Sequence, residues 1–349
     1  MPLLPNFLER FLFITLNAAP APAFEIFSAI SFRVVLAAIR LGVFDALTEQ
    51  PQTLSEIARA ANSSERGIAI LLDALVTIGY VTRAGDRYAL SRMAEKWITR
   101  AAGKASVAPA FRFFGTLLTE NFQSLEETIR AGKTVQDLYA ALENQPELSR
   151  DFQDWMVAIA NTINSEVLSK LEIPPHARRV LDIGGGHGWY SIALCRKYPH
   201  LNATIFDFPQ PLTSARANIA AEKMETRIQT RTGDFLRDDF GAGYDVALAF
   251  NIVHGLSAEQ NRDLLRRAHA ALNRGGVIAI IEQMAANVPS PSGRAINAML
   301  HLSFFHLIGG GIYSFDDLAA WLTATGFSNV RRSDFLRAPG SSLVMARKK

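Results

Sequence analysis

Cysteine and long apolar runs are scarce in this sequence, and each scarcity excludes a class of protein. Cys195 is the single cysteine among 349 residues, so no internal disulfide can form, and we expect a reducing compartment, the cytoplasm. No stretch of about 18 uncharged apolar residues occurs, which argues against a transmembrane helix. Residues 11–23, FLFITLNAAPAPA, look like a signal-peptide core, but Glu9 and Arg10 precede them. We therefore expect no cleaved signal.

A concentrated charge of one sign is also missing. The formal net charge is +3 and the isoelectric point is near 9.0, and the basic residues are scattered apart from those at 347–349. Without a basic stripe we expect no nucleic-acid partner. His301 and His306 have no cysteine or acid at ligand spacing, so the sequence predicts no metal site.

Glycine, in contrast, is concentrated in residues 180–191, VLDIGGGHGWYS. An apolar strand runs here into three consecutive glycines and then into a helix, and glycine lets the backbone turn sharply and approach a ligand closely. Gly184, Gly186 and Gly188 give the pattern G-x-G-x-G, whereas a dinucleotide site would need a glycine in place of Trp189. The segment resembles motif I of the class I S-adenosylmethionine-dependent methyltransferases. A glycine-rich turn without a ligand is the alternative.

Acidic side chains end three expected strands. Asp182 precedes the glycines, and Asp207 ends LNATIFDFP at a spacing suited to the ribose hydroxyls of a nucleotide-like ligand. Asp234 and Phe235 end RIQTRTGDFL. In the methyltransferase pattern this pair brackets the adenine, the acid accepting from its amine and the aromatic ring packing on its face. The resemblance therefore implies S-adenosylmethionine as cosubstrate, while a simple turn at Asp234 is the alternative.

Residues 53–92 predict a winged helix, which raises an alternative from another class, a DNA-binding regulator. Thr53 and Glu56 form a capping box that begins a first helix, and a second helix and two short strands follow. The second helix would be the one to enter a DNA groove, yet Arg66 is its one cation. Groove readers need several basic or amide side chains. We therefore expect this apolar helix to pack within the protein.

The winged helix, the helical segment after it and the order of motifs make the chain similar to the small-molecule O-methyltransferases, which include plant phenolic and bacterial natural-product enzymes. The resemblance implies an α/β fold, with a Rossmann-like class I methyltransferase sheet that is mostly parallel and has an antiparallel last strand. It implies a helical, winged-helix dimerisation domain at 1–105, a helical linker contributing to the acceptor pocket at 106–175, and a catalytic domain at 176–349. A homodimer is expected.

The most specific part of the resemblance is residues 249–276, AFNIVHGLSAEQNRDLLRRAHAALNRGG. His254 follows a strand that ends at Phe250, and the matching histidine of the family is the general base. Glu282 ends the next expected strand, 277–283, and matches a family glutamate that orients the histidine. Phe250 stands where the family has a lysine that contacts the cosubstrate, so we count it among the cosubstrate residues.

Besides Phe250, two further positions depart from the family pattern. Gly255 stands where the family has an aspartate, and Ile312 stands where it has a second glutamate. A phenol with a pKa of about 10 is mostly neutral at pH 7, so a histidine base can assist its methylation. With one carboxylate partner missing, C-methylation of an electron-rich ring and a family member that does not methylate are alternatives.

The acceptor is expected to be apolar. Met156 lies on a predicted helix at 152–171 that leads into the catalytic domain, and Phe304 and Phe305 lie in the aromatic segment 301–311. Packing in the core is the alternative role for each of them. The resemblance therefore implies methyl transfer to a hydroxyl of an apolar, aromatic or polyene small molecule, with His254 as base.

Overall fold

The structure of the chain is a computed structural model in which most of the residues are described. The described residues are 7–18, 20–99, 103, 105–285, 288 and 290–349. They fall into two compact units, 1–119 and 120–349, each presented by itself below. The boundary lies in helix α7 (Ala108–Glu120), so the predicted linker contributes to both units, and the three-part division stays a prediction. None of the described helices is long and apolar enough to cross a membrane.

The N-terminal unit contains the expected helix, helix and strand pair. It begins with α1 (Phe7–Arg10), a π-helix (Phe11–Thr15) and α2 (Ala23–Arg40). Its further elements before α7 are α3 (Val43–Ala46), β1 (Gln52–Thr53), α4 (Leu54–Ala60), α5 (Glu65–Thr77), β2 (Val81–Ala84), β3 (Arg87–Leu90) and α6 (Arg92–Trp97). The three strands form an antiparallel sheet in the order β1-β3-β2.

Helix α5 is held by packing, as its apolar sequence predicts. Ile68, Leu72 and Leu75 recur at helical spacing and are fully buried in the core of this unit. The preceding helix α4 begins at the predicted capping box, in which Thr53 Oγ1 accepts from the Glu56 N–H and the Glu56 carboxylate accepts from the Thr53 N–H. The apolar residues of α5, the helix that would enter a DNA groove in a DNA-binding regulator, thus stabilise the N-terminal unit by packing in its core.

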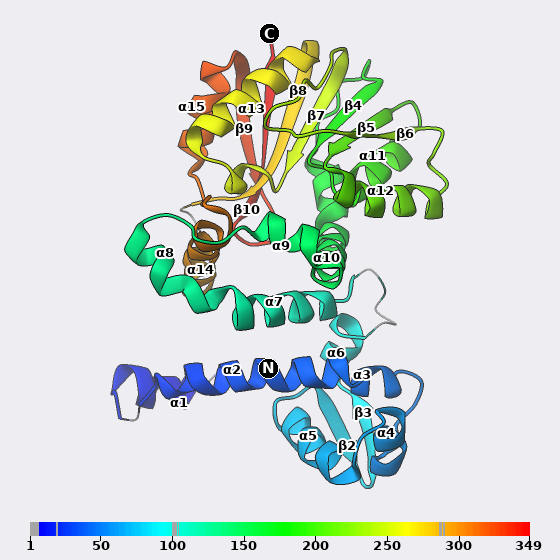
Figure 1. Cartoon of the computed structure of the whole chain (residues 1–349), viewed down its shortest axis with the longest axis vertical. Coiled ribbons are helices and arrows are strands. Elements are labelled where there is room, and N and C mark those ends of the chain that lie inside the picture. Colours follow the sequence, from blue (N-terminus) through cyan, green and yellow to red (C-terminus); the bar gives the residue numbers. More distant parts are fainter. Residues whose placement is uncertain (1–6, 19, 100–102, 104, 286–287, 289) are drawn as a thin grey trace. The chain divides into compact units, whose positions relative to one another are not determined.

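The C-terminal unit alternates helices and strands (Figure 1). After the short 3-10 helix Phe122–Ser124, its helices are α8 (Leu125–Ala131), α9 (Leu138–Asn144), α10 (Pro146–Lys170), α11 (Trp189–Lys197), α12 (Pro209–Ala221), the 3-10 helix Val253–Gly255, α13 (Ala258–Ala271), α14 (Pro291–Ile308) and α15 (Phe315–Ala324). Its strands are β4 (Arg179–Ile183), β5 (Asn202–Asp207), β6 (Ile228–Thr232), β7 (Tyr244–Phe250), β8 (Leu272–Gln283), β9 (Phe327–Asp334) and β10 (Ser341–Lys348).

These strands form one sheet of seven in the described chain, in the order β6-β5-β4-β7-β8-β10-β9. The first five are parallel, and β10 runs antiparallel to both β8 and β9. The predicted Rossmann-like sheet with an antiparallel last strand is therefore confirmed. Open sheets of this kind bind ligands outside the carboxyl ends of their strands, where the strand order reverses, and here that point lies between β4 and β7.

Both faces of the sheet are buried, because successive strand residues point to opposite faces. Val180 of β4 joins the apolar cluster that contains residues of α10, α11 and α12, and Leu181 joins the cluster that contains residues of α13 and α15. One boundary differs from the prediction. Strand β8 begins at Leu272, directly after α13, rather than at Val277, and the chain passes through Gly275 at φ +78° within the strand.

Candidate active site

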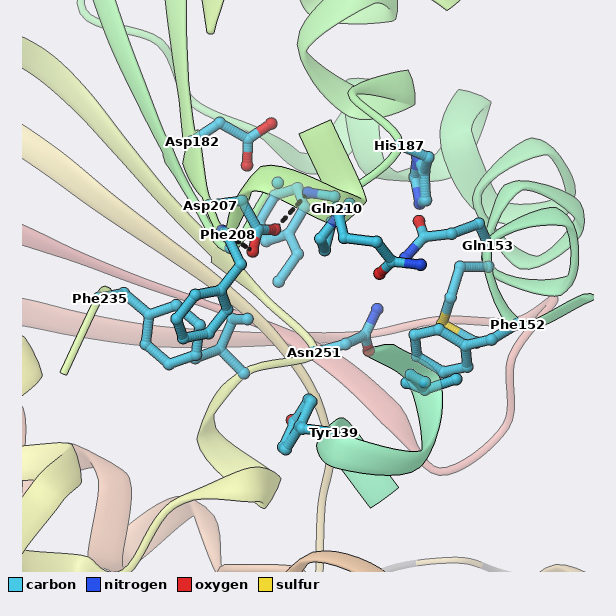
Figure 2. Close-up of a pocket in the computed structure, with 18 of the residues that line it drawn as sticks. Tyr139, Phe152, Gln153, Asp182, His187, Asp207, Phe208, Gln210, Phe235 and Asn251 are labelled. Carbon is cyan, nitrogen blue, oxygen red and sulfur yellow. Dashed lines mark hydrogen bonds between the residues drawn. The ribbon is translucent and has the colours of Figure 1, made fainter. Parts of the chain in front are cut away.

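A cavity of about 320 Å³ lies at the carboxyl ends of β4, β5 and β7, where the fold predicts a ligand site (Figure 2). Of the residues predicted to bind the cosubstrate, the cavity lining includes Asp182, Gly184, Gly186, Asp207, Phe235 and Phe250. The predicted acceptor residue Met156 also lines it, from α10. Residues far apart in the sequence thus meet in one cavity.

The glycine loop leaves β4 through backbone conformations that favour glycine. Gly184 has φ +63° and Gly186 has φ +45°, in the left-handed region that side chains with a Cβ rarely adopt. A Cβ on Gly184 would also overlap with the side chain of Ile252. The Gly186 N–H donates to Asp207 Oδ2 at 2.8 Å, so the loop after β4 is tied to the end of β5.

Asp207 is a buried carboxylate with one backbone donor on each oxygen. Oδ2 accepts from Gly186, and Oδ1 accepts from the Phe208 N–H at 2.7 Å. Each oxygen keeps a second lone pair, so the carboxylate can still accept two ligand hydroxyls. Burial raises the pKa of Asp207 to about 6, and a ligand that donates hydrogen bonds to the ionised form would lower it again.

Asp182 lies deeper, beneath the glycine loop. Its side chain is fully buried, and its Oδ2 accepts from the Ser191 hydroxyl at 2.6 Å. Burial raises the pKa of Asp182 to about 7, and the charge on Asp207 adds to the rise. A Cβ on Gly185 would lie 2.6 Å from Asp182 Cγ, so the loop packs directly on this carboxyl.

Aromatic rings form another part of the wall. Phe208 and Phe235 lie with their ring centroids 5.7 Å apart, and both line the cavity. Asp234, predicted to reach the adenine, is absent from the described lining, and its Oδ1 accepts from the Leu236 N–H at 2.8 Å. Phe250 packs edge-on against Tyr190, with centroids 4.9 Å apart.

His254 and Glu282 form the side-chain pair that the sequence predicts. His254 Nδ1 lies 2.7 Å from Glu282 Oε2, and Glu282 Oε1 accepts from the Val253 N–H at 2.7 Å. The Phe304 ring stacks on the imidazole at 4.1 Å between centroids. The carboxylate is buried and the histidine side chain is 16% exposed. Two contacts therefore fix the imidazole, one at its edge and one on its face.

This pair lies beside the 320 Å³ cavity and does not line it. The two side chains line a small cavity of about 10 Å³ instead, while Asn251 and Ile252, just before His254 in the chain, line the 320 Å³ cavity. The predicted acceptor residue Phe305 lines a separate hollow of about 540 Å³. Phe304 thus contacts the histidine, and Phe305 lies elsewhere.

The lining residues that were not predicted include Tyr139, Gln153, His187 and Asn251. Gln153 Oε1 is buried without a hydrogen-bond partner among the described residues. His187 Nδ1 accepts from the Trp189 N–H at 3.0 Å, and burial lowers the pKa of His187 to about 4, so the ring stays neutral. Asn251 has φ +58°, a conformation uncommon outside glycine. Of these residues, only Asn251 could have been found from the sequence, because it lies between the predicted site residues Phe250 and His254.

Family comparisons agree with this architecture. A model of the O-methyltransferase domain matches residues 118–328, and a model of the O-methyltransferase dimerisation domain matches residues 25–100. The human N-acetylserotonin methyltransferase structure in complex with SAM is 20% identical, with a TM-score of 0.81 over 95% of this chain and 99% of that one. At this identity the likeness shows the fold alone.

Curated relatives resemble the chain over nearly its whole length. The 3-hydroxy-5-methyl-1-naphthoate 3-O-methyltransferase of Streptomyces sahachiroi is 27% identical over 320 residues, which cover 90% of each chain. The L-tyrosine C(3)-methyltransferase of Streptomyces lavendulae is 27% identical over 333 residues, which cover 90% of this chain and 88% of the relative. Because the catalytic-domain match spans more than half of the sequence, the chain belongs to the O-methyltransferase family.

Proposed function

We propose that this enzyme transfers the methyl group of S-adenosylmethionine to a hydroxyl of an apolar aromatic or polyene small molecule, with His254 as general base. S-adenosylmethionine is the cosubstrate of the family. The observation that carries the proposal is the 2.7 Å contact between His254 Nδ1 and Glu282 Oε2 beside the cavity. A buried carboxylate in this position keeps the imidazole in one orientation.

The residues of the cavity fit the proposed cosubstrate. Asp207 retains one lone pair on each oxygen for the two ribose hydroxyls. The rings of Phe208 and Phe235 offer apolar faces for adenine. Gln153 Oε1, buried and unpartnered among the described residues, suits the ammonium group of the methionine part. When bound, the cosubstrate supplies a sulfonium methyl that is already activated for transfer.

The protein's own chemistry is then proton removal and alignment. Because Glu282 Oε2 accepts from Nδ1–H, the basic lone pair of His254 lies on Nε2. The proton of the acceptor hydroxyl would pass to Nε2 as the methyl group moves from the sulfonium sulfur, which becomes a neutral thioether, to the acceptor oxygen. The Val253 N–H holds the carboxylate, and Phe304 holds the ring plane. The cavity walls supply proximity and in-line orientation.

C-methylation is the second candidate, and two observations favour it. Gly255 and Ile312 stand where the family pattern has carboxylates, and one relative of this chain is named as an L-tyrosine C(3)-methyltransferase. Ile312 is buried, and its N–H donates to His301 Nδ1. The two candidates differ in the proton that the methyl group replaces: O-methylation replaces the proton of the acceptor hydroxyl, whereas C-methylation replaces a ring proton and leaves the hydroxyl in the product.

A direct experiment tests the proposed reaction. The purified chain is titrated calorimetrically with S-adenosylmethionine without added metal and then incubated with apolar phenols, and mass spectrometry and NMR locate the new methyl group. We expect binding of the cosubstrate and a methyl group on oxygen. Preferential binding of NAD would overturn the cosubstrate assignment, and methyl groups found on carbon alone would replace O-methylation with the second candidate.

We also propose that the N-terminal domain forms a cytoplasmic homodimer. Apolar residues of α2 are exposed, including Ile26, Phe27 and Ile30 at 64%, 55% and 52%, and the dimerisation-domain match covers them. A contiguous apolar surface is poorly compatible with a soluble monomer. Light scattering should give about twice 38.3 kDa. A clean monomer would overturn the dimer and reopen the DNA-binding alternative, which a salt-dependent mobility-shift assay would then examine.

A further inference from the structure

Tyr139 places a hydroxyl group in the cavity at some distance from the glycine loop. The residue lies in the first turn of α9, which Asp137 caps by accepting from the Ala140 N–H at 3.0 Å. Its side chain is half exposed and lines the cavity. Figure 2 shows it on the far side of Asn251 from Asp182. No residue of the described chain forms a hydrogen bond with its hydroxyl, which leaves the group available to a ligand.

The hydroxyl lies against Gly255, the residue that follows the proposed base. A Cβ added to Gly255 would be 3.2 Å from Tyr139 Oη and 3.6 Å from Ile308 Cδ1. The φ angle of Gly255 lies outside the left-handed region, so the backbone itself does not require glycine here. What a side chain would disturb is the space that the tyrosine hydroxyl occupies.

The environment keeps this phenol neutral. Although half of the side chain is exposed, the protein around it excludes part of the water and raises the pKa of Tyr139 to about 12, and the negative charges of Asp207, Glu282 and Asp137 add to the rise. A neutral phenol carries one O–H donor and can also accept. At pH 7 the cavity therefore presents an uncharged hydrogen-bonding group beside Gly255, the residue that follows His254 in the chain.

We infer that Tyr139 is a specificity-determining residue whose hydroxyl hydrogen-bonds a second oxygen of the acceptor, next to the hydroxyl that His254 deprotonates, and that Gly255 provides the space for it. The inference rests on the proposed function and names its substrate class. That class is aromatic compounds with two neighbouring oxygens, such as adjacent hydroxyls. An acceptor with a single oxygen would leave the tyrosine hydroxyl without its partner in a largely apolar site.

A matched pair of probes tests this inference by binding, apart from turnover. The full chain, saturated with S-adenosylhomocysteine, is titrated with 2,3-dihydroxynaphthalene and with 2-naphthol, which lacks one of the two oxygens. We expect the wild type to prefer the diol by about 3- to 10-fold, the range of one hydrogen bond. Tyr139→Phe should abolish that preference. Gly255→Ala, which displaces the hydroxyl, should reduce it, and the double variant should lose no more than Tyr139→Phe alone.

A second tyrosine provides the control. Tyr198 lies outside the cavity lining, beside His200, so Tyr198→Phe should retain the preference for the diol. Binding of neither probe, equal binding of both by the wild type, or a preference that survives in Tyr139→Phe would overturn the inference. Failure of the proposed function would look different, because the chain would then bind no S-adenosylhomocysteine or transfer no methyl group to any phenol.

Discussion

The two ends of the proposed site are held in different ways. At the cosubstrate end, Asp182 and Asp207 end neighbouring parallel strands, and backbone N–H groups and Ser191 hold their carboxyl groups. At the acceptor end, His254 is held by one side chain at its edge and another on its face. The helices that contribute there, α9, α10 and α14, lie outside the hydrogen-bonded register of the sheet.

The difference teaches how one fold can serve many acceptors. Sheet register and backbone donors fix the cosubstrate end, so its geometry depends on few side chains. The acceptor end depends on side chains from helices and loops, which can change without altering the sheet. The relatives fit this division, since one is named for a naphthoate and another for tyrosine, while both align with nearly the whole chain.

The largest expected effect is at the acceptor end. His254→Ala should lower kcat for an O-methylated phenol by about 100- to 10,000-fold, the range of a lost general base. Its Kd for S-adenosylmethionine should stay close to that of the wild type. Its residual rate should rise as the pH approaches the phenol's pKa of about 10, because the substrate then arrives ionised. Glu282→Gln should lower kcat by a smaller factor than His254→Ala. If His254→Ala kept near-normal rates and its products were methylated on carbon, His254 would not be the general base.

At the cosubstrate end, the sharpest test compares two aspartates. Asp207→Ala should weaken S-adenosylmethionine binding about 100-fold or more, because it removes the acceptor proposed for two hydroxyls. Asp234→Ala is the matched control, since that carboxylate bonds the Leu236 N–H and lies off the described lining. Calorimetry should find a much smaller loss of S-adenosylmethionine affinity in Asp234→Ala than in Asp207→Ala. Equal losses would support the contact between Asp234 and adenine that the sequence pattern predicts.

The buried carboxyl of Asp182 should make stability depend on pH. Its pKa is raised from 3.8 to about 7, so the folded state holds its proton more tightly than the unfolded state. The resulting stabilisation is complete below about pH 4 and lost as the pH rises to about 7. Relative to Asp182→Asn, which cannot ionise, wild-type stability should fall across this window by about 1–4 kcal/mol. Urea unfolding of both proteins from pH 4.5 to 8 measures this difference in the free energy of unfolding. If the two free energies changed in parallel with pH, the prediction would be wrong.

The smallest expected effect separates two adjacent phenylalanines. Phe304→Leu removes the ring stacked on His254, which should lower kcat by about 3- to 10-fold, the range of one aromatic contact. Phe305→Leu changes a residue that lines the separate hollow and should leave kcat near the wild-type value. Steady-state kinetics on both variants decides between them. Equal losses would instead assign both rings to the acceptor, as the sequence predicts.

What the sequence could predict follows the same division. Asp182 lies near the end of β4, just before the glycines, and Asp207 ends β5, so a local pattern was enough to find both acids. Tyr139 and Gln153 lie on helices whose approach to the cavity depends on tertiary packing, and no local pattern indicates that. Asp234 illustrates a further limit, because its carboxylate bonds the N–H two residues ahead, a local turn that competes with a ligand contact.

The position of β10 inside the sheet has a consequence for synthesis. Strand β10 fills the place between β8 and β9, which do not pair with each other. Until residues 341–348 have left the ribosome, the backbone N–H and C=O groups of β8 that pair with β10 form an open edge, in a strand that carries the apolar residues Ile278 and Ile280. Unpaired apolar edges of this kind invite association between nascent chains. The sheet that carries the site therefore has an open edge from the synthesis of β8, which ends at Gln283, until β10 has emerged.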